Sequence, residues 1–394
     1  MPTIPTDFVP ARIDATNWSQ IEPLLKRLLD RPVNAAKDLE KWLLDRSELM
    51  AACAEAESDL YIDMTCDTEN KAAQEAFTRY IENIPPQLKP LCFALDQRQT
   101  ELAKKFPLSP DRYQVLTRDT AAEVELFRDE NVPIQTELDK LSQQYQQIIG
   151  AMMVKYDGMD KTLPMMAVYL ESTDRAVREK SWRLVAERRL QDAEAIDDVY
   201  DTSIGLRTTM ARNAGFDTFT GYAFKSKKRF DYGPADCVKF HNACATAVVP
   251  FLRRLDEKRK RLLKVDALRP WDLGVDPKGR PPLKPFTNGP DLIRKSMDTF
   301  QRLDPSLAAM LAKLGDGANT MGATNGACLD LDSRKGKAPG GYQAMRDRRR
   351  EAFIFMNAAG LHRDVETMVH EAGHAFHSML CIDEPLLQIG RAHV

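Results

Sequence analysis

The chain lacks the features of several specialised protein classes. It has no uninterrupted apolar run of roughly 18 residues that could cross a membrane, and its start lacks the basic-then-apolar pattern of a signal peptide. A net charge of −2 gives no general attraction to nucleic acid or anionic membranes, and the local basic run 346–350 predicts a solvated surface. We therefore expect a cytoplasmic protein that binds neither nucleic acid nor membranes.

Cysteine is scarce and irregularly placed. The seven cysteines are odd in number and form no C-x-x-C pair, which predicts reduced thiols rather than a disulfide framework or a thiolate zinc site. A chain of 394 residues with 43% hydrophobic and 29% charged residues can bury a large core and is typical of a soluble globular protein.

Most of the sequence predicts helix. Residues 134–152 repeat apolar side chains at steps of three and four, which predicts one buried stripe on a helix that ends at 157–158. Further helices are expected at 177–189 and 196–210. The segment 266–290, rich in proline and glycine, predicts a long loop.

The pattern changes in the last quarter of the chain. Residues 328–332 alternate with period two and 352–357 form a short apolar run, so both predict strands. The loop between them does not match a phosphate-binding motif, because Gly336-Lys337 is followed by alanine. Its Gly340-Gly341 pair would permit close backbone approach, as when an extended peptide lies along an edge strand.

The segment His370-Glu371-Ala372-Gly373-His374 is the most informative motif. Two histidines four residues apart on a helix lie one turn above each other, so both imidazoles can bind one Zn²⁺. Glu371 would lie beside that ion, placed to take a proton from a metal-bound water. The alternative is a surface helix that carries polar histidines without a metal.

The helix that carries this motif is predicted to be amphipathic, with Asp364 as its N-cap. His377 shares the histidine face, and we interpret it as a neighbour of the site rather than a zinc ligand. The opposite face is apolar and comprises Val365, Met368, Val369, Ala372, Phe376, Met379 and Leu380.

Three segments together resemble the M3 family of zinc metallopeptidases, and more closely its oligoendopeptidase F branch. They are LDLDSRKGKAPGGYQ (329–343), FIFMN (353–357) and DVETMVHEAGHAFH (364–377). Upstream, 172–182 and 207–224 also resemble the helical region of the family. The pairing of the glycine loop with the zinc helix is more specific than the histidine motif alone.

The resemblance implies a mainly α, zincin-like metallopeptidase fold with a small β-sheet beside the histidine helix. It implies a helical lobe at 1–190, a catalytic domain at 191–388 and a narrow channel that admits short unstructured peptides. His370 and His374 are carried over as zinc ligands and Glu371 as the general base. The substrate-binding residues carried over are Gly340, Gly341 and Tyr342.

The chain departs from the family beyond the second histidine. The family's third ligand is a glutamate on the next helix, but no residue of Ser378–Val394 fits that role, because Glu384 precedes Pro385 at a turn. We therefore expect a fragment that lacks the C-terminal part and is nearly inactive. Residues 389–394 are expected to be a non-native tail, since a common sequencing-adapter stretch encodes this hexapeptide. A missing C-terminal part should also leave the apolar face of the 365–380 helix under-covered.

Three functions fit the sequence. The leading hypothesis is a cytoplasmic zinc metalloendopeptidase that hydrolyses internal bonds of short peptides. A non-catalytic peptide-binding protein is the second, although the intact Glu371 argues against it. The third is a related helical zinc carboxypeptidase, which would release C-terminal residues instead of cleaving internal bonds.

Overall fold

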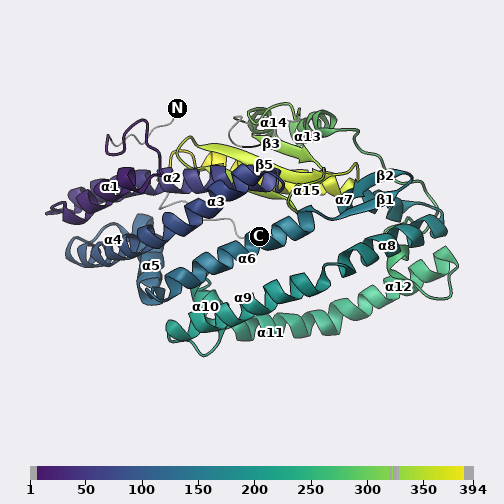
Figure 1. The fold of residues 1–394 in the computed structure, drawn as a ribbon, viewed down its shortest axis with the longest axis horizontal. Helices are drawn as coiled ribbons and strands as arrows, with labels where there is room; N and C mark the ends of the chain where they lie inside the picture. Colours follow the sequence, from purple (N-terminus) through teal and green to yellow (C-terminus); the bar gives the residue numbers. More distant parts are fainter. Residues whose placement is uncertain (1–6, 319–321, 323–325, 327, 386–394) are drawn as a thin grey trace.

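The computed structural model describes residues 7–318, 322, 326 and 328–385 and is mostly helical, as predicted (Figure 1). It contains the expected small sheet beside the histidine helix and a second, two-stranded sheet that was not predicted. No helix in these ranges is both long and apolar enough to span a membrane. The helices before the first strand are α1 (Trp18–Asp30), α2 (Ala36–Cys66), α3 (Lys71–Asn83), α4 (Pro85–Lys105), α5 (Pro110–Leu126) and α6 (Asn131–Gly150). A hairpin, β1 (Met153–Tyr156) and β2 (Met159–Thr162), then leads into α7 (Leu163–Ala167), η1 (Val168–Glu171), α8 (Arg175–Leu190), α9 (Ala193–Asn213) and α10 (Phe219–Ser226).

The second half holds one long helical segment and the central sheet. The segment consists of α11 (Pro234–Ala243), the π-helical turn η2 (Cys244–Val248) and α12 (Val249–Leu263). It is followed by η3 (Pro270–Asp272), α13 (Gly289–Leu303), α14 (Pro305–Ala312), β3 (Leu329–Asp332), β4 (Tyr342–Arg346), β5 (Glu351–Ala358) and α15 (His362–Leu380).

The central sheet is covered on both faces. Its order is β3-β5-β4, with β3 parallel and β4 antiparallel to β5. Alternate residues of β5 point to opposite sides, so Phe353 and Phe355 pack with Ile62 of α2 while Ile354 and Met356 pack with α13, α14 and α15. A strand buried on both faces reads as a continuous apolar run, which is why β5 was predicted from the sequence. β3 was also predicted, whereas β4 was not.

Helix α6 differs from its prediction. It ends at Gly150, and the Asp157-Gly158 pair forms the turn of the β1–β2 hairpin, with φ of 52° and 78°. The predicted apolar stripe is only partly confirmed, since Met152 is buried but Tyr145 is 41% exposed. The buried positions of α6 include the polar Thr136 and Gln143.

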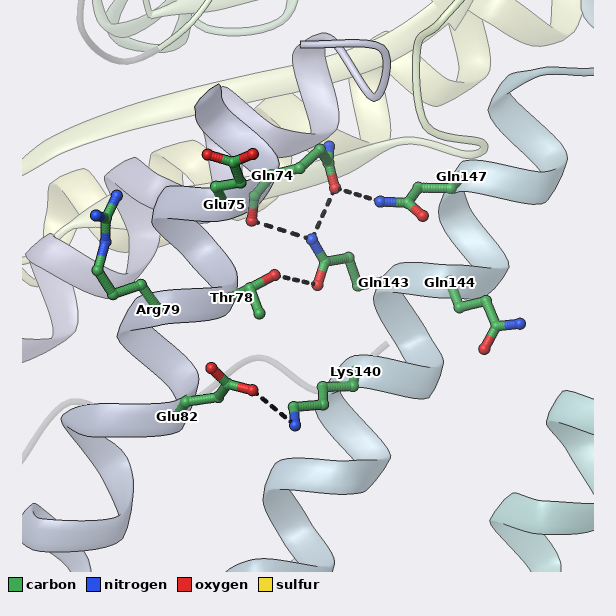
Figure 2. Close-up of a pocket in the computed structure, with 9 residues that line it drawn as sticks. All are labelled: Gln74, Glu75, Thr78, Arg79, Glu82, Lys140, Gln143, Gln144 and Gln147. Atoms are coloured by element: carbon green, nitrogen blue, oxygen red, sulfur yellow. Dashed lines mark hydrogen bonds and ion pairs between the residues drawn. The ribbon is translucent and has the colours of Figure 1, made fainter. Parts of the chain in front are cut away.

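The polar face of α6 is explained by amide hydrogen bonds to α3 (Figure 2). The Gln74 Oε1 atom accepts from the side-chain amides of Gln143 and Gln147, each at 2.8 Å, and Thr78 donates to Gln143 Oε1 at 3.0 Å. These side chains form the floor of a groove of about 460 Å³ between the two helices. Because the buried amides satisfy one another, the helices can pack through polar rather than apolar side chains.

The basic run 346–350 is not simply a solvated surface. Arg346 is fully buried and pairs with Asp59 of α2 at 3.0 Å. Arg349 pairs with Glu55 at 3.0 Å, and the backbone N–H groups of Arg348 and Arg349 donate to the same carboxylate. The run therefore fixes the β4–β5 turn to α2.

The apolar face of α15 is also better covered than expected. Met368 and Phe376 are buried, and the Phe376 ring makes an edge contact with Phe300 of α13 at 5.0 Å. Two members of the expected face remain exposed, Val369 at 37% and Leu380, the last residue of the helix, at 74%. Extensive apolar exposure lies instead on α11, η2 and α12, at Val238, Phe240, Val248, Val249, Phe251, Leu252, Leu255 and Leu262.

The predicted loop 266–290 is confirmed except for its last two residues, which begin α13, and for the short turn η3, which is fixed to α8. The Arg175 guanidinium donates two hydrogen bonds to the Asp272 carboxylate at 3.0 and 2.9 Å, and Arg178 adds a third at 3.0 Å. The carboxylate has no solvent exposure. Its bonds with Arg175, and then with Arg178, outweigh the effect of burial and hold the pKa of Asp272 at about 2.

We expect Asp272→Asn to lower the free energy of unfolding at pH 7 by about 2 kcal/mol, since one pKa unit corresponds to about 1.4 kcal/mol. The folded pKa lies below the unfolded value, so this contribution is complete above about pH 4 and is lost as the pH falls towards 2. Urea unfolding at pH 7 and at pH 3 measures both effects. The control is Asp298→Asn, whose carboxylate is exposed on α13. If Asp272→Asn lowered the free energy of unfolding by the same amount at pH 7 and pH 3, the low pKa assigned to Asp272 would be wrong.

Candidate active site

Helix α15 carries the histidine motif, and it starts earlier than predicted. The helix begins at His362 with Leu361 as its N-cap residue. Asp364, expected at the N-cap, instead occupies the third helical position. Its Oδ2 atom accepts from the backbone N–H of Leu361 at 2.9 Å and of Ala359 at 2.8 Å. The buried carboxylate thereby satisfies N–H groups at the start of the helix.

The two motif histidines lie side by side on the open face of α15. Their Nε2 atoms are 3.2 Å apart, and their ring planes are 85° apart. Two nitrogens bound to one tetrahedral zinc ion at about 2.0–2.1 Å lie roughly 3.3–3.4 Å from each other. The spacing of His370 and His374 therefore fits a single zinc ion.

Glu371 lies between these histidines in the sequence but is much less exposed than His370. Its side chain is 7% exposed. Burial raises the pKa of Glu371, while His370, His374 and a hydrogen bond from the backbone N–H of Gln343 oppose that rise. The Gln343 N–H comes from β4, so the sheet positions this carboxylate beside the histidines.

His377 is on the same open face but contacts a different residue. Its Nε2 atom is 3.9 Å from the Sγ atom of Cys381, one turn further along α15. Within the described part of the chain, no group of three or more histidine, cysteine, aspartate or glutamate side chains could hold a metal ion. The motif therefore brings together two imidazole nitrogens and one carboxylate.

The glycine loop between β3 and β4 passes close to Glu371. A Cβ atom at Gly341 would lie 3.2 Å from Thr367 Cγ2 and 3.7 Å from Glu371 Oε1, so the loop backbone packs directly on α15. Asn357 holds the loop in this position by donating to the carbonyl oxygens of Ala338 and Gly340, both at 2.9 Å. Gly341 therefore permits a close approach to the protein's own helix, whereas the approach of an extended peptide stays a prediction.

Tyr342 was expected among the substrate-binding residues, and its side chain is already engaged. Its hydroxyl is 2.7 Å from Thr65 Oγ1, and its ring stacks on Phe355 with centroids 4.7 Å apart. Burial raises the pKa of Tyr342 well above its usual range. The phenol therefore connects the glycine loop to α2.

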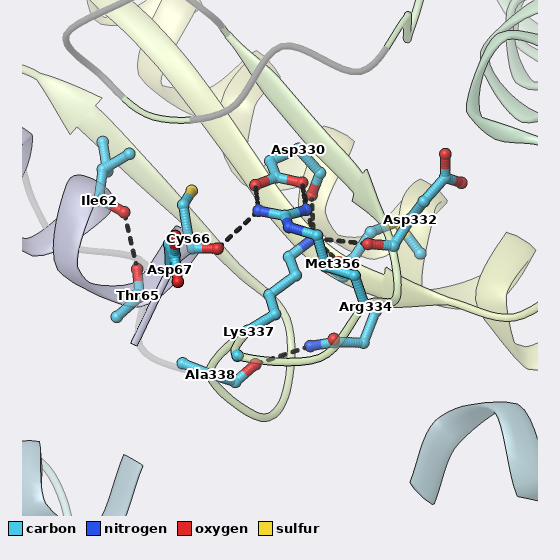
Figure 3. Close-up of polar contacts among 12 residues, drawn as sticks. Ile62, Thr65, Cys66, Asp67, Asp330, Asp332, Arg334, Lys337, Ala338 and Met356 are labelled. Carbon is cyan, nitrogen blue, oxygen red and sulfur yellow. Dashed lines mark hydrogen bonds and ion pairs between the residues drawn. The ribbon is translucent and has the colours of Figure 1, made fainter. Parts of the chain in front are cut away.

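Lys337 fixes the other end of the glycine loop (Figure 3). Its ammonium group has no solvent exposure and donates to the carbonyl oxygens of Asp330, Asp332 and Met356 at 3.0, 3.1 and 2.5 Å. It also pairs with the Asp330 carboxylate at 2.8 Å, and that carboxylate accepts two bonds from Arg334, each at 2.7 Å. The loop is therefore held where the parallel strands β3 and β5 end.

The electrostatics of this cluster keep it charged near neutral pH. Burial lowers the pKa of Lys337 to about 8, although Asp330 partly opposes this effect. Burial pushes the pKa of Asp330 upward, but Arg334 and Lys337 outweigh it and leave that pKa below its ordinary value. Sequence reasoning had treated the lysine only as evidence against a phosphate loop. In the sequence, the signal that could have indicated this buried ion pair was Asp330, a charged residue inside the alternating strand pattern 328–332.

Comparison with known proteins gives a family and a fold. The model of peptidase family M3 matches residues 168–388, which is more than half of the chain. Comparison with curated proteins returned no match. A proposed oligoendopeptidase F from Bacillus anthracis str. Ames superposes with a TM-score of 0.85 at 19% identity, covering 95% of this chain and 68% of that one.

Two further solved structures show the same likeness. Another proposed oligoendopeptidase F has a TM-score of 0.82, and a PZ peptidase A with a bound inhibitor has 0.83. Each is 22% identical and covers 94% of this chain. This chain spans 64% of the length of each of these two structures. At such identities the superpositions establish a shared fold.

We expect Lys337→Met to lower the free energy of unfolding by about 3–5 kcal/mol, because it leaves buried carbonyl oxygens without a donor and breaks a buried ion pair. Lys335→Met is the matched control. Lys335 is exposed and forms a surface ion pair with Glu69, so we expect a change within about 0.5 kcal/mol. Chemical unfolding at pH 7 measures both variants. If both variants changed the free energy of unfolding by the same small amount, the buried ammonium of Lys337 would not be what holds the loop.

Proposed function

Because the chain belongs to peptidase family M3, we propose that it provides two zinc ligands and the general base of a zinc-dependent endopeptidase. In this proposal the substrates are short unstructured peptides, which are cleaved at internal bonds. The proposed location is the cytoplasm, and the proposed division is a helical lobe at 1–190 and a catalytic domain at 191–388.

The observation that supports this function best is the 3.2 Å separation of the His370 and His374 Nε2 atoms, with the Glu371 carboxylate on the same helical turn. In the proposal both histidines bind zinc as neutral imidazoles. When bound, zinc would supply Lewis acidity that polarises the scissile carbonyl and lowers the pKa of a nearby water. His377 is proposed to remain outside the ligand set, because its ring contacts Cys381.

Glu371 is proposed as the general base. Partial burial raises its pKa, which makes the carboxylate a better proton acceptor than an exposed glutamate. It would take a proton from the attacking water and later deliver it to the leaving amine. The Gln343 N–H keeps the carboxylate oriented during both transfers.

Substrate binding is proposed at the glycine loop and the adjoining edge strand. Among the described strands, β4 is an edge strand of the central sheet, and Gly340 and Gly341 directly precede it. An extended peptide could align with this backbone by strand addition, which recognises main-chain groups rather than particular side chains. Tyr342 would contribute through its backbone, since its phenol contacts Thr65.

A zinc peptidase site needs a third protein ligand. The described residues offer no third side chain of a suitable type next to His370 and His374. We propose that the third ligand, and the donors that stabilise the oxyanion, come from residues outside the described ranges. The tail proposed at 389–394 also lies outside them.

We expect His370→Ala and His374→Ala each to remove most specific Zn²⁺ binding, while His377→Ala changes it little. Glu371→Gln should retain the binding, because the glutamate is not a ligand. Isothermal titration calorimetry of the four variants at pH 7 distinguishes these roles. A loss with His377→Ala as large as that with His374→Ala would mean that His377 is a ligand.

We expect the 394-residue chain to cleave an internally quenched peptide at least about 100-fold more slowly than a relative with a complete site, since one missing oxyanion donor costs about 10²–10³ in rate. Any residual activity should disappear in Glu371→Gln. Mass spectrometry of the products separates cleavage at internal bonds from stepwise release of C-terminal residues. Turnover equal to that of the relative, and abolished by Glu371→Gln, would show that the chain completes its own site.

A further inference from the structure

A second cavity of about 260 Å³ lies where α4, α5, α6, α9 and α10 meet, and none of the candidate active-site residues lines it. Its walls combine apolar side chains with four charged residues. Phe93 and Phe127 stack with ring centroids 4.2 Å apart, and the side chains of Leu126, Val132 and Met210 add aliphatic and thioether surface. Apolar and aromatic side chains together with convergent polar groups are the usual components of a small-molecule site.

Lys89 places an unpaired cation in this cavity. Among the described residues, no acceptor lies within hydrogen-bonding or ion-pair distance of its Nζ atom, although Asp139 and Glu57 attract it from further away. Burial lowers the pKa of Lys89. The Lys89 side chain is partly exposed, so its ammonium is not committed to a protein acceptor and is free to pair with the anionic group of a ligand.

Tyr222 provides a second unmatched donor. It lines the same cavity from α10, and no acceptor for its hydroxyl is found among the described residues. Burial raises the pKa of Tyr222, so the phenol keeps its proton at neutral pH. Its ring packs against Phe216 and Phe219, with centroids 5.8 and 5.9 Å away, which limits rotation of the side chain.

The other charged groups of the cavity already have partners. Asp96 pairs with Arg46 at 2.6 Å and Glu123 pairs with Lys228. The Arg128 guanidinium donates to backbone carbonyl oxygens, including those of Asn213 at 3.0 Å and Phe127 at 2.6 Å. Lys89 and Tyr222 are thus two donors without an acceptor among the described residues, one cationic and one neutral, and together they suit a ligand group with one negative charge.

We propose that this cavity binds the carboxylate of a compound with a small apolar body, with Lys89 as its counter-ion and Tyr222 as a second donor. The stacked phenylalanines favour an aromatic body. A singly charged carboxylate fits better than a phosphate, because Asp96 and Glu123 at the same cavity would repel a second negative charge. The carboxylate could belong to a free aromatic acid or to the C-terminal residue of a peptide.

The test uses the 394-residue chain without added metal and two acid–amide pairs, phenylacetate with phenylacetamide and N-acetylphenylalanine with its amide. Titration calorimetry should show that at least one acid binds about tenfold or more tightly than its amide. The pair that shows the larger difference identifies the source of the carboxylate. No binding by either acid, or equal binding of acid and amide in both pairs, would overturn the proposal.

Variants then assign the site. Lys89→Met should weaken acid binding at least tenfold and raise the melting temperature, because it removes an unpaired, partly buried charge. Tyr222→Phe should weaken binding severalfold, whereas Lys313→Met, at an exposed position on the surface, should change nothing. If Lys89→Met does not fold, the Val132→Phe variant tests the site instead. This substitution fills the cavity and keeps the lysine, so it should also weaken acid binding. Undiminished acid binding to Lys89→Met or Val132→Phe would overturn the assignment.

Discussion

The hydrogen bonds of one buried ammonium group hold the central sheet and its loop together. Lys337 connects carbonyl oxygens of β3 and β5 with the Asp330 carboxylate, at the point where the two parallel strands end. Desolvating a lysine is costly, so the group is stable only because each of its donors has an acceptor and a carboxylate balances its charge. The Phe355 ring adds a cation–π contact at 4.5 Å. With this end of the loop fixed, Gly341 at the other end packs on α15 beside Glu371.

The candidate active site is therefore assembled from both faces of the sheet. On one face, α15 presents His370 and His374 to the open side and buries Met368 and Phe376 against β5 and α13. On the other face, α2 contacts the sheet through Ile62 and the hydroxyl of Thr65. Both helices contact the sheet or its glycine loop, so the distance between the loop backbone and Glu371 depends also on α2, which contributes no residue to the candidate active site.

The sequence predicted the parts of this arrangement that follow a local pattern. The period-two alternation of 328–332 and the apolar run of 352–357 identified β3 and β5, and the histidine spacing identified α15. β4 was missed because Tyr342–Arg346 is only partly apolar and becomes a strand by pairing with β5. The polar face of α6 was missed for a related reason, since Gln143 is buried by a partner amide that lies 69 residues away in the sequence. Local periodicity carries no information about such partners.

The contacts between α2 and the sheet join residues that are far apart along the chain. Thr65 and Tyr342 are separated by 277 positions, Cys66 and Arg334 by 268, and Asp59 and Arg346 by 287. During synthesis, α2 therefore leaves the ribosome long before the segments that it must contact. Bringing the two together closes a very large loop, although the entropic cost rises only by about 0.6 kcal/mol for each doubling of loop length. The helices up to α12 can form from local contacts, whereas the geometry around Glu371 forms only after the last third of the described chain has been made, which makes the site a late product of folding.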